Sequence, residues 1–344
     1  AGARTAVGRM PMTGLAIGLA LIASFSYGTG SVVVRSAVRS HTAASVALWV
    51  QAVGLSVLLI GAAVVRPPVS LGALVWGAAA GSLVACGVLS FYTAMQNGPI
   101  SLVAPVAATG VTVPVAGGLL LGEKVSGLAL AGLALVVIGV MAIARSHGSG
   151  VSMSEADVHG GMTVLATPPG RSQVTPVHDN CKPASFARPQ LAAAVLSVVS
   201  AAAFGVFYLV LRQATAAASA TTAAADSSSA DNYPFSAALL VAVAVQSGSL
   251  LVTFATATRH TIKCVLPSQQ LITFTAAIGL LDVIGDLALT YAIALGPVSL
   301  VGPLGSLDPM VAVLLASIFF REPLSRRRAF GLAACAAGIA LVAV

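Results

Sequence analysis

The octapeptide GPISLVAP at residues 98–105 recurs as GPVSLVGP at residues 296–303. Each copy begins a long apolar run that ends at an acidic residue, Glu123 in the first copy and Glu322 in the second. The octapeptides lie 198 residues apart and the two glutamates 199 residues apart, so the second copy carries one inserted residue. An internal repeat of this length predicts an architecture in which two halves are built on the same plan.

The repeat extends on both sides of the octapeptide. Residues 26–35, SYGTGSVVVR, align with residues 203–212, AFGVFYLVLR, at an offset of 177. Residues 86–98 align with residues 284–296 at an offset of 198, which is larger by 21. The difference of 21 between the two offsets is close to the length of the Ala- and Ser-rich stretch at 213–235. We therefore interpret that stretch as an insert in the second half.

The composition is that of a membrane protein. Of 344 residues, 58% are hydrophobic and 8% are charged, and the mean hydropathy is +0.98, whereas soluble domains are about 25% charged. We count ten apolar runs, most of them long enough to cross a hydrocarbon core of about 30 Å as a helix. The runs lie at about 13–34, 43–65, 71–95, 99–121, 125–144, 190–212, 236–257, 269–295, 297–319 and 327–344.

Five runs per half is an odd number, so the second half is expected to enter the membrane from the opposite face. The sequence therefore predicts an all-α integral membrane protein with ten transmembrane helices arranged as two inverted five-helix repeats, as in secondary transporters. The expected domains are a first repeat at 1–144, a flexible polar loop at 145–189, and a second repeat at 190–344 that contains the low-complexity insert 213–235. Both the loop and the insert are interpreted as flexible connectors that cannot bury enough apolar area to fold alone.

Residues 91–143 and 279–342 resemble EamA domains of the drug/metabolite transporter superfamily. Both contain A-x-x-x-G-P-x-S-L-V-x-P, an apolar span, a glutamate three residues before a serine, and a final helix with spaced glycines. The resemblance implies a ten-helix carrier of small solutes such as metabolites, amino acids or drugs. It does not imply one substrate, because the family is functionally broad.

Three carboxylates fall deep inside apolar runs: Asp282 and Asp286 in the eighth, and Asp308 in the ninth. A charge at this depth costs several kcal/mol unless it is paired, protonated or hydrated, so it marks a functional site by default. The i, i+4 spacing places Asp282 and Asp286 on one helix face, and Thr290 continues that face. Asp308 precedes Pro309 where the ninth helix is expected to kink and free backbone groups for a solute.

The repeat separates these carboxylates from the shared scaffold. Their first-half counterparts are apolar or small, namely Val84, Val88 and Gly110, while Tyr92 is the counterpart of Thr290. The expected substrate-binding residues are therefore Asp282, Asp286, Asp308, Thr290 and Tyr92. A structural alternative is that the carboxylates pair with Arg212, or with backbone and hydroxyl groups, as part of the buried structure. Glu123 and Glu322 are interpreted as interfacial turn residues, and Arg35 and Arg212 as side chains that reach the headgroups.

These observations favour a secondary active transporter, or permease, that carries a small polar or cationic metabolite or drug by alternating access. Coupling to protons through the carboxylates is left open, as are a magnesium or divalent-cation permease and a non-transporting membrane partner or sensor. No enzyme is expected, because the chain contains no G-x-S-x-G or H-E-x-x-H and lacks the first glycine of GxGD before Asp286.

The expected partners are a small-molecule substrate, the lipid bilayer and, as an open alternative, protons as the coupling ion. A homodimer is also left open.

No cofactor or metal is expected, since the polar residues of the long loop match no ligand spacing; these are His147, His159, His178, Asp157, Asp179 and Cys181. No basic run suited to nucleic acid occurs either. The expected location is the plasma (inner) membrane, with multiple passes. Its orientation is undecided: twelve Lys and Arg on one side against five on the other put the termini outside, whereas the family resemblance implies the cytoplasm.

Overall fold

The structure is a computed structural model that describes residues 9–40, 43–97, 106–107, 109–123, 126–146, 189–225, 233–256, 269–319 and 326–343. Every regular element in these ranges is a helix, which confirms the all-α class. The helices are α2 (Arg9–Ser40), α3 (Ala43–Val65), α4 (Leu71–Asn97), η1 (Thr109–Val111), α6 (Thr112–Leu120), α7 (Gly127–Ser146), α9 (Pro189–Ala225), α10 (Tyr233–Thr256), α12 (Gln269–Leu295), α13 (Val298–Gly305), α14 (Asp308–Phe319) and α15 (Arg326–Ala343).

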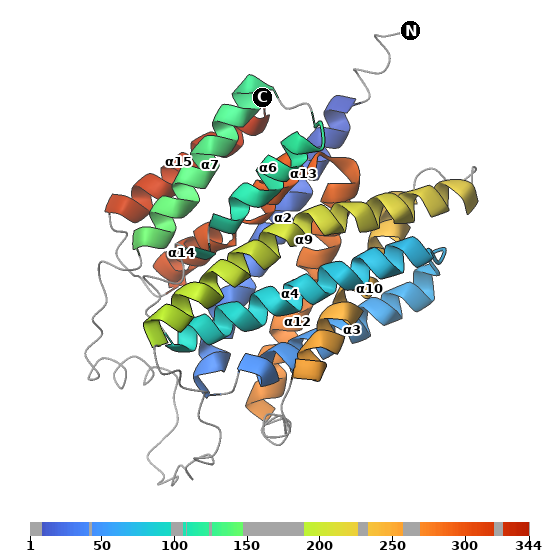
Figure 1. Ribbon diagram of the computed structural model, residues 1–344, viewed down its shortest axis with the longest axis horizontal. Coiled ribbons are helices and arrows are strands. Elements are labelled where there is room, and N and C mark those ends of the chain that lie inside the picture. The colour runs from blue at the N-terminus through green and yellow to red at the C-terminus, as the bar shows by residue number, and fades with distance from the viewer. Residues whose placement is uncertain are drawn as a thin grey trace.

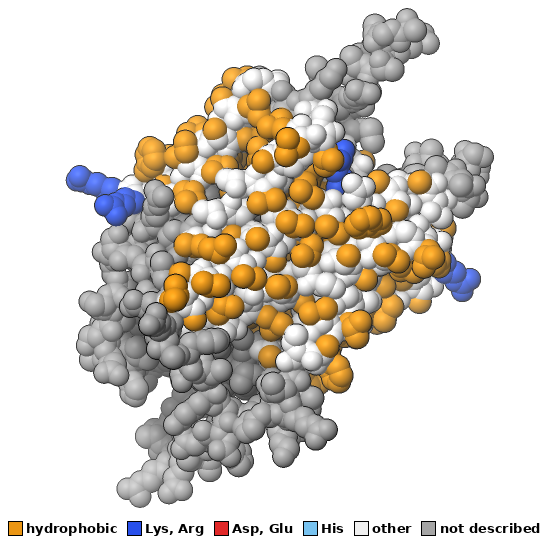
Figure 2. Space-filling model, in the orientation of Figure 1, with side chains coloured by type: hydrophobic (Ala, Val, Ile, Leu, Met, Phe, Trp, Pro, Cys, Tyr) orange, Lys and Arg blue, Asp and Glu red, His pale blue; other side chains and the backbone are white. Residues whose placement is uncertain are grey.

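Six of these helices, α2, α3, α4, α9, α10 and α12, are long and apolar enough to cross a membrane. Their outward side chains are apolar as well: Val64, Leu71 and Leu251 are 79%, 77% and 69% exposed. Hydrophobic side chains cover the described part of the face in Figure 2, and the few Lys and Arg lie toward its edges. Such a surface is suited to lipid, in which no polar coat is needed.

The helices form one bundle with a paired extension. Along one side α4 packs against α9 and α10, and α3 packs against α10 and α12. On the other side α7 lies along α15 (Figure 1). Helix α2 packs on α12, α13 and α14 and so connects the two sides through the centre.

Close contacts in one half recur in the other at the repeat offset. A Cβ added at Gly28 would lie 2.5 Å from Cβ of Val311, and one added at Gly205 would lie 2.5 Å from Cβ of Val113. These separations are shorter than real Cβ contacts allow, so only glycine permits the approach. Gly28 aligns with Gly205, and Val113 aligns with Val311, so the same close approach is made twice.

The α7–α15 pair contains a second such match. A Cβ at Gly139 would lie 2.7 Å from the carbonyl oxygen of Gly331, and a Cβ at Gly338 would lie 2.6 Å from that of Gly132. The two contacts are related by the offset of 199 residues. Small residues that let helix backbones approach closely are the usual means of packing helices in a bilayer.

The ninth apolar run is broken, as the sequence predicts. Helix α13 ends at Gly305 and α14 begins at Asp308. The Ser24 hydroxyl of α2 bridges the break, because it donates to the carbonyl oxygen of Leu304 and accepts a 3.3 Å hydrogen bond from the Leu307 N–H. Two of the backbone groups that the kink frees are therefore taken up by α2 rather than left for a solute.

The interpretation of residues 213–235 as a flexible connector is wrong for 233–235, where α10 begins, and for 213–225. Helix α9 continues through this stretch to Ala225. Ala214 and Ala218 are 0% and 1% exposed, and Thr221 donates a 2.9 Å hydrogen bond to the Ser70 hydroxyl. Alanine is the strongest helix former, so a run of low complexity here extends a helix that packs on α4. Residues 226–232 lie outside the described residues, as do 147–188 with their histidines.

Candidate substrate-binding site

Two of the predicted carboxylates lie on the central helix α12. Asp282 and Asp286 are one turn apart, partly buried, and close enough to interact electrostatically. Thr290 lies one turn further along and is 2% exposed. The helical spacing thus brings these three side chains to one face of α12, as predicted.

Asp286 is bound by a residue from a different helix. The Tyr27 hydroxyl of α2 donates a hydrogen bond of 2.6 Å to Oδ1 of Asp286. The Tyr27 ring lies directly on the backbone of α12, since a Cβ at Gly285 would be 2.6 Å from Cε1 of that ring. Gly285 therefore provides the space that lets the phenol reach the neighbouring carboxylate.

Two further tyrosines extend this polar cluster. Tyr92 of α4 lies close enough to Asp282 to interact with it electrostatically. Tyr208 of α9 interacts in the same way with Tyr27 and with Asp308, and its hydroxyl is 2.9 Å from that of Ser306. Together these groups form the central polar cluster, which comprises Tyr27, Tyr92, Tyr208, Asp282, Asp286, Ser306 and Asp308.

Asp308 enters this cluster from the broken ninth helix. It is the first residue of α14 and is partly buried. An acidic residue in the first turn is stabilised by the partial positive charge of the helix N-terminus. The break between α13 and α14 thus explains how a carboxylate is held at this depth in the bundle.

The cluster is asymmetric with respect to the repeat. In the other half the Phe204 ring takes the place of Tyr27, and a Cβ at Gly87 would lie 3.0 Å from it. Val88 takes the place of Asp286. The same ring-on-glycine packing therefore occurs in both halves, but only one of them carries a hydroxyl and a carboxylate.

Chemically, the cluster combines carboxylate acceptors with phenol donors and aromatic faces. Carboxylates bind cations by charge, and aromatic rings add to this when a cation lies over their face. The predicted residues Asp282, Asp286, Asp308 and Tyr92 are brought together here. Tyr208 and Ser306 were missed by sequence reasoning. Tyr27 appeared in the sequence only within the aligned stretch 26–35, although its alignment with Phe204 marks the added hydroxyl.

Arg212 does not pair with the carboxylates of the central polar cluster. Its Nε lies 3.5 Å from Oε1 of Glu123, so the alternative in which Arg212 pairs with the deep aspartates is wrong. The alternative in which a hydroxyl group is the partner is seen for Asp286, which accepts from Tyr27. Arg212 also lies within α9 rather than at a helix end. The prediction that Arg212 lies at a helix end is therefore wrong.

Glu123 is more than an interfacial turn residue. Its side chain is 7% exposed, and its carboxylate accepts hydrogen bonds of 3.1 Å and 2.9 Å from the N–H groups of Val298 and Ser299. These are N–H groups of the first turn of α13, where no intrahelical partner exists. Glu322 and the side chain of Arg35 lie outside the described residues.

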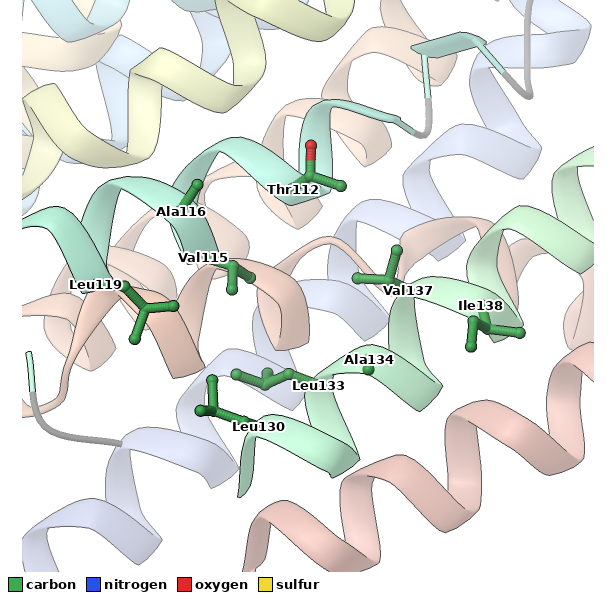
Figure 3. Close-up of a pocket in the computed structure, with 9 residues that line it drawn as sticks. All are labelled: Thr112, Val115, Ala116, Leu119, Leu130, Leu133, Ala134, Val137 and Ile138. Atoms are coloured by element: carbon green, nitrogen blue, oxygen red, sulfur yellow. The ribbon is translucent and has the colours of Figure 1, made fainter. Parts of the chain in front are cut away.

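Apolar grooves lie away from the cluster. One of about 450 Å³ runs between α6 and α7, and Figure 3 shows Val115 and Leu119 on one side and Leu130 and Val137 on the other. A second of about 360 Å³ lies where α6 meets α9. Neither contains a predicted substrate-binding residue. Both have the apolar lining expected of grooves that face lipid.

Within the described ranges, no group of three or more His, Cys, Asp or Glu side chains is placed to hold a metal ion. Mg²⁺ is usually bound by one or two carboxylates together with several retained waters. The Asp282–Asp286 pair could supply the two carboxylates. Its tyrosine neighbours, however, are poor ligands for this ion.

The model of the EamA-like transporter family matches residues 14–145 and 191–344. The match covers most of the chain, and the chain belongs to this family of membrane transporters. The resemblance seen in the two repeated stretches is therefore confirmed. The chain is accordingly a multi-pass membrane protein of a transporter family, and that family is not an enzyme family.

Two individual proteins are also similar. An uncharacterized protein of Methanocaldococcus jannaschii is 32% identical over 80 residues, which are 23% of this chain and 58% of that protein. The chain thus spans less than two thirds of this curated relative. One crystal structure of another protein matches with a TM-score of 0.62 and 16% sequence identity, covering 95% of each chain. At that identity the likeness shows the fold alone.

Proposed function

We propose that this protein is a secondary active transporter that moves a small polar or cationic metabolite or drug by alternating access. The observation that carries the proposal is the hydrogen bond between Tyr27 and Asp286 inside the bundle. A carboxylate at this depth is expensive in lipid, and a phenol from a second helix holds it in place. Such an arrangement is suited to binding a solute, because the charge stays available near the centre of the membrane.

The architecture belonging to this proposal is ten helices in two inverted five-helix repeats, residues 1–144 and 190–344, joined by the loop 145–189. It is supported by the close contacts that recur at the repeat offset, Gly28–Val311 with Gly205–Val113. Repeat-related contacts between the two halves are expected when each half packs against the other about a pseudo-two-fold axis. The break at Gly305 is suited to the rocking of one half against the other.

The substrate site of the proposal contains Asp282, Asp286, Asp308, Thr290 and Tyr92. We add Tyr27 to it because this residue donates a hydrogen bond to Asp286. The carboxylates attract the positive charge of a solute, and the phenol rings contact its apolar part. Since all three carboxylates belong to the second half, the charged end of the solute binds on that side. The proposed location is the plasma membrane, with protons as the coupling ion exchanged at the same carboxylates.

The decisive experiment is transport by purified protein in liposomes. A thermal-shift screen with organic cations, amino acids and Mg²⁺ identifies ligands, and uptake of the best one is then measured with and without a pH gradient. We expect Asp282→Asn, Asp286→Asn and Asp308→Asn each to abolish transport or its pH dependence. Asp231→Asn, outside the apolar runs, is the matched control. Unchanged transport in all three variants would contradict the proposed site, and a shift with Mg²⁺ alone would favour the cation permease.

A further inference from the structure

We propose that Glu123 is a gating residue, which holds one end of the transport path closed by capping α13 from the opposite half of the protein. The contacts define the Glu123 latch, which consists of Glu123, Arg212 and the N–H groups of Val298 and Ser299. The proposal rests on the transporter function and adds to it a residue that controls which side is open.

The local sequence places the carboxylate. Helix α6 ends in a Schellman motif, in which the Glu123 N–H donates to Gly118 O at 3.1 Å and the Gly122 N–H donates to Leu119 O at 3.0 Å. Gly122 has a φ of +81°, a conformation that glycine adopts without strain. The residue after this glycine is thereby turned away from α6, which directs the Glu123 side chain toward α13.

The carboxylate then supplies a cap that α13 lacks. The N-cap residue of α13 is Pro297, which gives the helix no side-chain hydrogen bond. Glu123 satisfies the N–H groups of Val298 and Ser299 with one oxygen each. Negative charge at a helix N-terminus is also favoured by the helix dipole. The first turn of α13 is therefore held by a residue 175 positions earlier in the chain.

The approach of the two helices depends on a small residue. A Cβ at Gly118 would lie 2.5 Å from Oε2 of Glu123 and 2.8 Å from Cβ of Ser299. Arg212 closes the latch from a third helix, with its Nε 3.5 Å from Oε1 of Glu123 and its side chain 34% exposed. The end of α6, the start of α13 and the middle of α9 therefore meet at one carboxylate.

Three properties make this contact a gate rather than an ordinary cap. It joins the two halves that must separate for alternating access. It is charge-assisted, so it is strong when formed. It also covers Ser299, which is 0% exposed and whose hydroxyl has no hydrogen-bond partner among the described residues. Opening of the latch would expose that hydroxyl, and closure would bury it again.

Ser299 offers a reporter that does not require a known substrate. In a background without native cysteines, Ser299→Cys replaces a hydroxyl that makes no hydrogen bond to the described residues, so the change costs little. Labelling by a membrane-impermeant thiol reagent is measured in vesicles of both orientations. We expect slow labelling in this parent protein, from one side only, because the latch buries the site.

Glu123→Gln in this background is the test. The neutral amide keeps one acceptor, but its NH₂ group meets an N–H donor of α13, so the bidentate cap is lost. We expect the labelling rate to rise by about tenfold or more, as a shifted two-state equilibrium predicts. Asp231→Asn, outside the apolar runs, is the matched control and should leave the labelling of residue 299 unchanged.

Retained folding is checked by size-exclusion chromatography and thermal unfolding, and Glu123→Asp provides a second variant that keeps the charge. Equal labelling rates in the parent and in well-folded Glu123→Gln protein would overturn the proposal. Faster labelling without transport of any screened solute would support the latch while contradicting the transporter. Intact transport with unchanged labelling would contradict the latch alone.

Discussion

The Tyr27 hydroxyl lies 2.6 Å from Oδ1 of Asp286, although the two residues are 259 positions apart in the chain. The repeat-related positions hold Phe204 and Val88, which have no polar side-chain atoms. Packing of a ring on a glycine is thus common to both halves, whereas the polar pair is confined to one. This difference separates what builds the bundle from what is available to recognise a solute.

Tyr27→Phe should lower the stability of the protein, because it removes the hydrogen bond to Asp286. A hydrogen bond to a carboxylate is worth about 1.5–3 kcal/mol, so the apparent unfolding temperature in detergent should fall. In a double-mutant cycle with Asp286→Ala, which removes the acceptor, the two losses should not add, because they break the same contact. Thr221→Val, which loses the hydrogen bond to the Ser70 hydroxyl outside the central polar cluster, is the control and should add fully to Asp286→Ala. Additive losses for Tyr27→Phe would refute the pair.

Gly28→Ala and Gly205→Ala should be destabilising to a similar degree. Each new methyl group would lie 2.5 Å from the Cβ of a valine in another helix, and overpacking of this kind typically costs about 1–3 kcal/mol. Gly18→Ala is the matched control, because nothing lies within 4 Å of the added Cβ. It should be neutral or stabilising. Thermal unfolding of the three purified variants measures the effect, and a harmless alanine at either tight position would argue against the repeated contact.

Ser24→Ala should loosen the junction between α13 and α14. The variant leaves the Leu304 carbonyl and the Leu307 N–H without their bridging hydroxyl, and unsatisfied buried groups cost about 1–3 kcal/mol each. We expect a lower unfolding temperature and faster hydrogen exchange at residues 304–308, measured by mass spectrometry. Ser200→Ala is the control, since the Ser200 hydroxyl is buried and has no hydrogen-bond partner among the described residues. Equal exchange in both variants would show that the bridge is unimportant.

Ala218→Leu should destabilise the protein, whereas Ala216→Leu should not. Ala218 is 1% exposed and Ala216 is exposed on the same stretch of α9, so only the first substitution forces a larger side chain into a packed interface. Denaturation in detergent compares the two, with an expected loss of about 1–3 kcal/mol for the buried site. Identical stabilities would mean that residues 213–225 do not pack as a helix against α4.

Much of the fold was predictable from residue types alone. Apolar runs of membrane-spanning length identify the helices, because a bilayer leaves backbone groups no partner outside a helix. The Asp308–Pro309 pair predicted the break in the ninth run, since α13 ends at Gly305 and α14 begins at Asp308. The extension of α9 to Ala225 was missed because a polar, low-complexity composition was taken as disorder, although alanine favours helix.

The candidate site, like the fold, was predictable from the sequence only in part. Depth in an apolar run identified Asp282, Asp286 and Asp308, because the cost of burying charge is a property of the sequence position. Their partners could not be deduced, because Tyr27 reaches Asp286, and Glu123 reaches Ser299, only after helices distant in the chain pack side by side. The sequence by itself determined which segments are helices, which are duplicated and which carry costly charge. Only the tertiary structure decided which charge is held by which group, because contacts across a bundle depend on close approaches at single glycines.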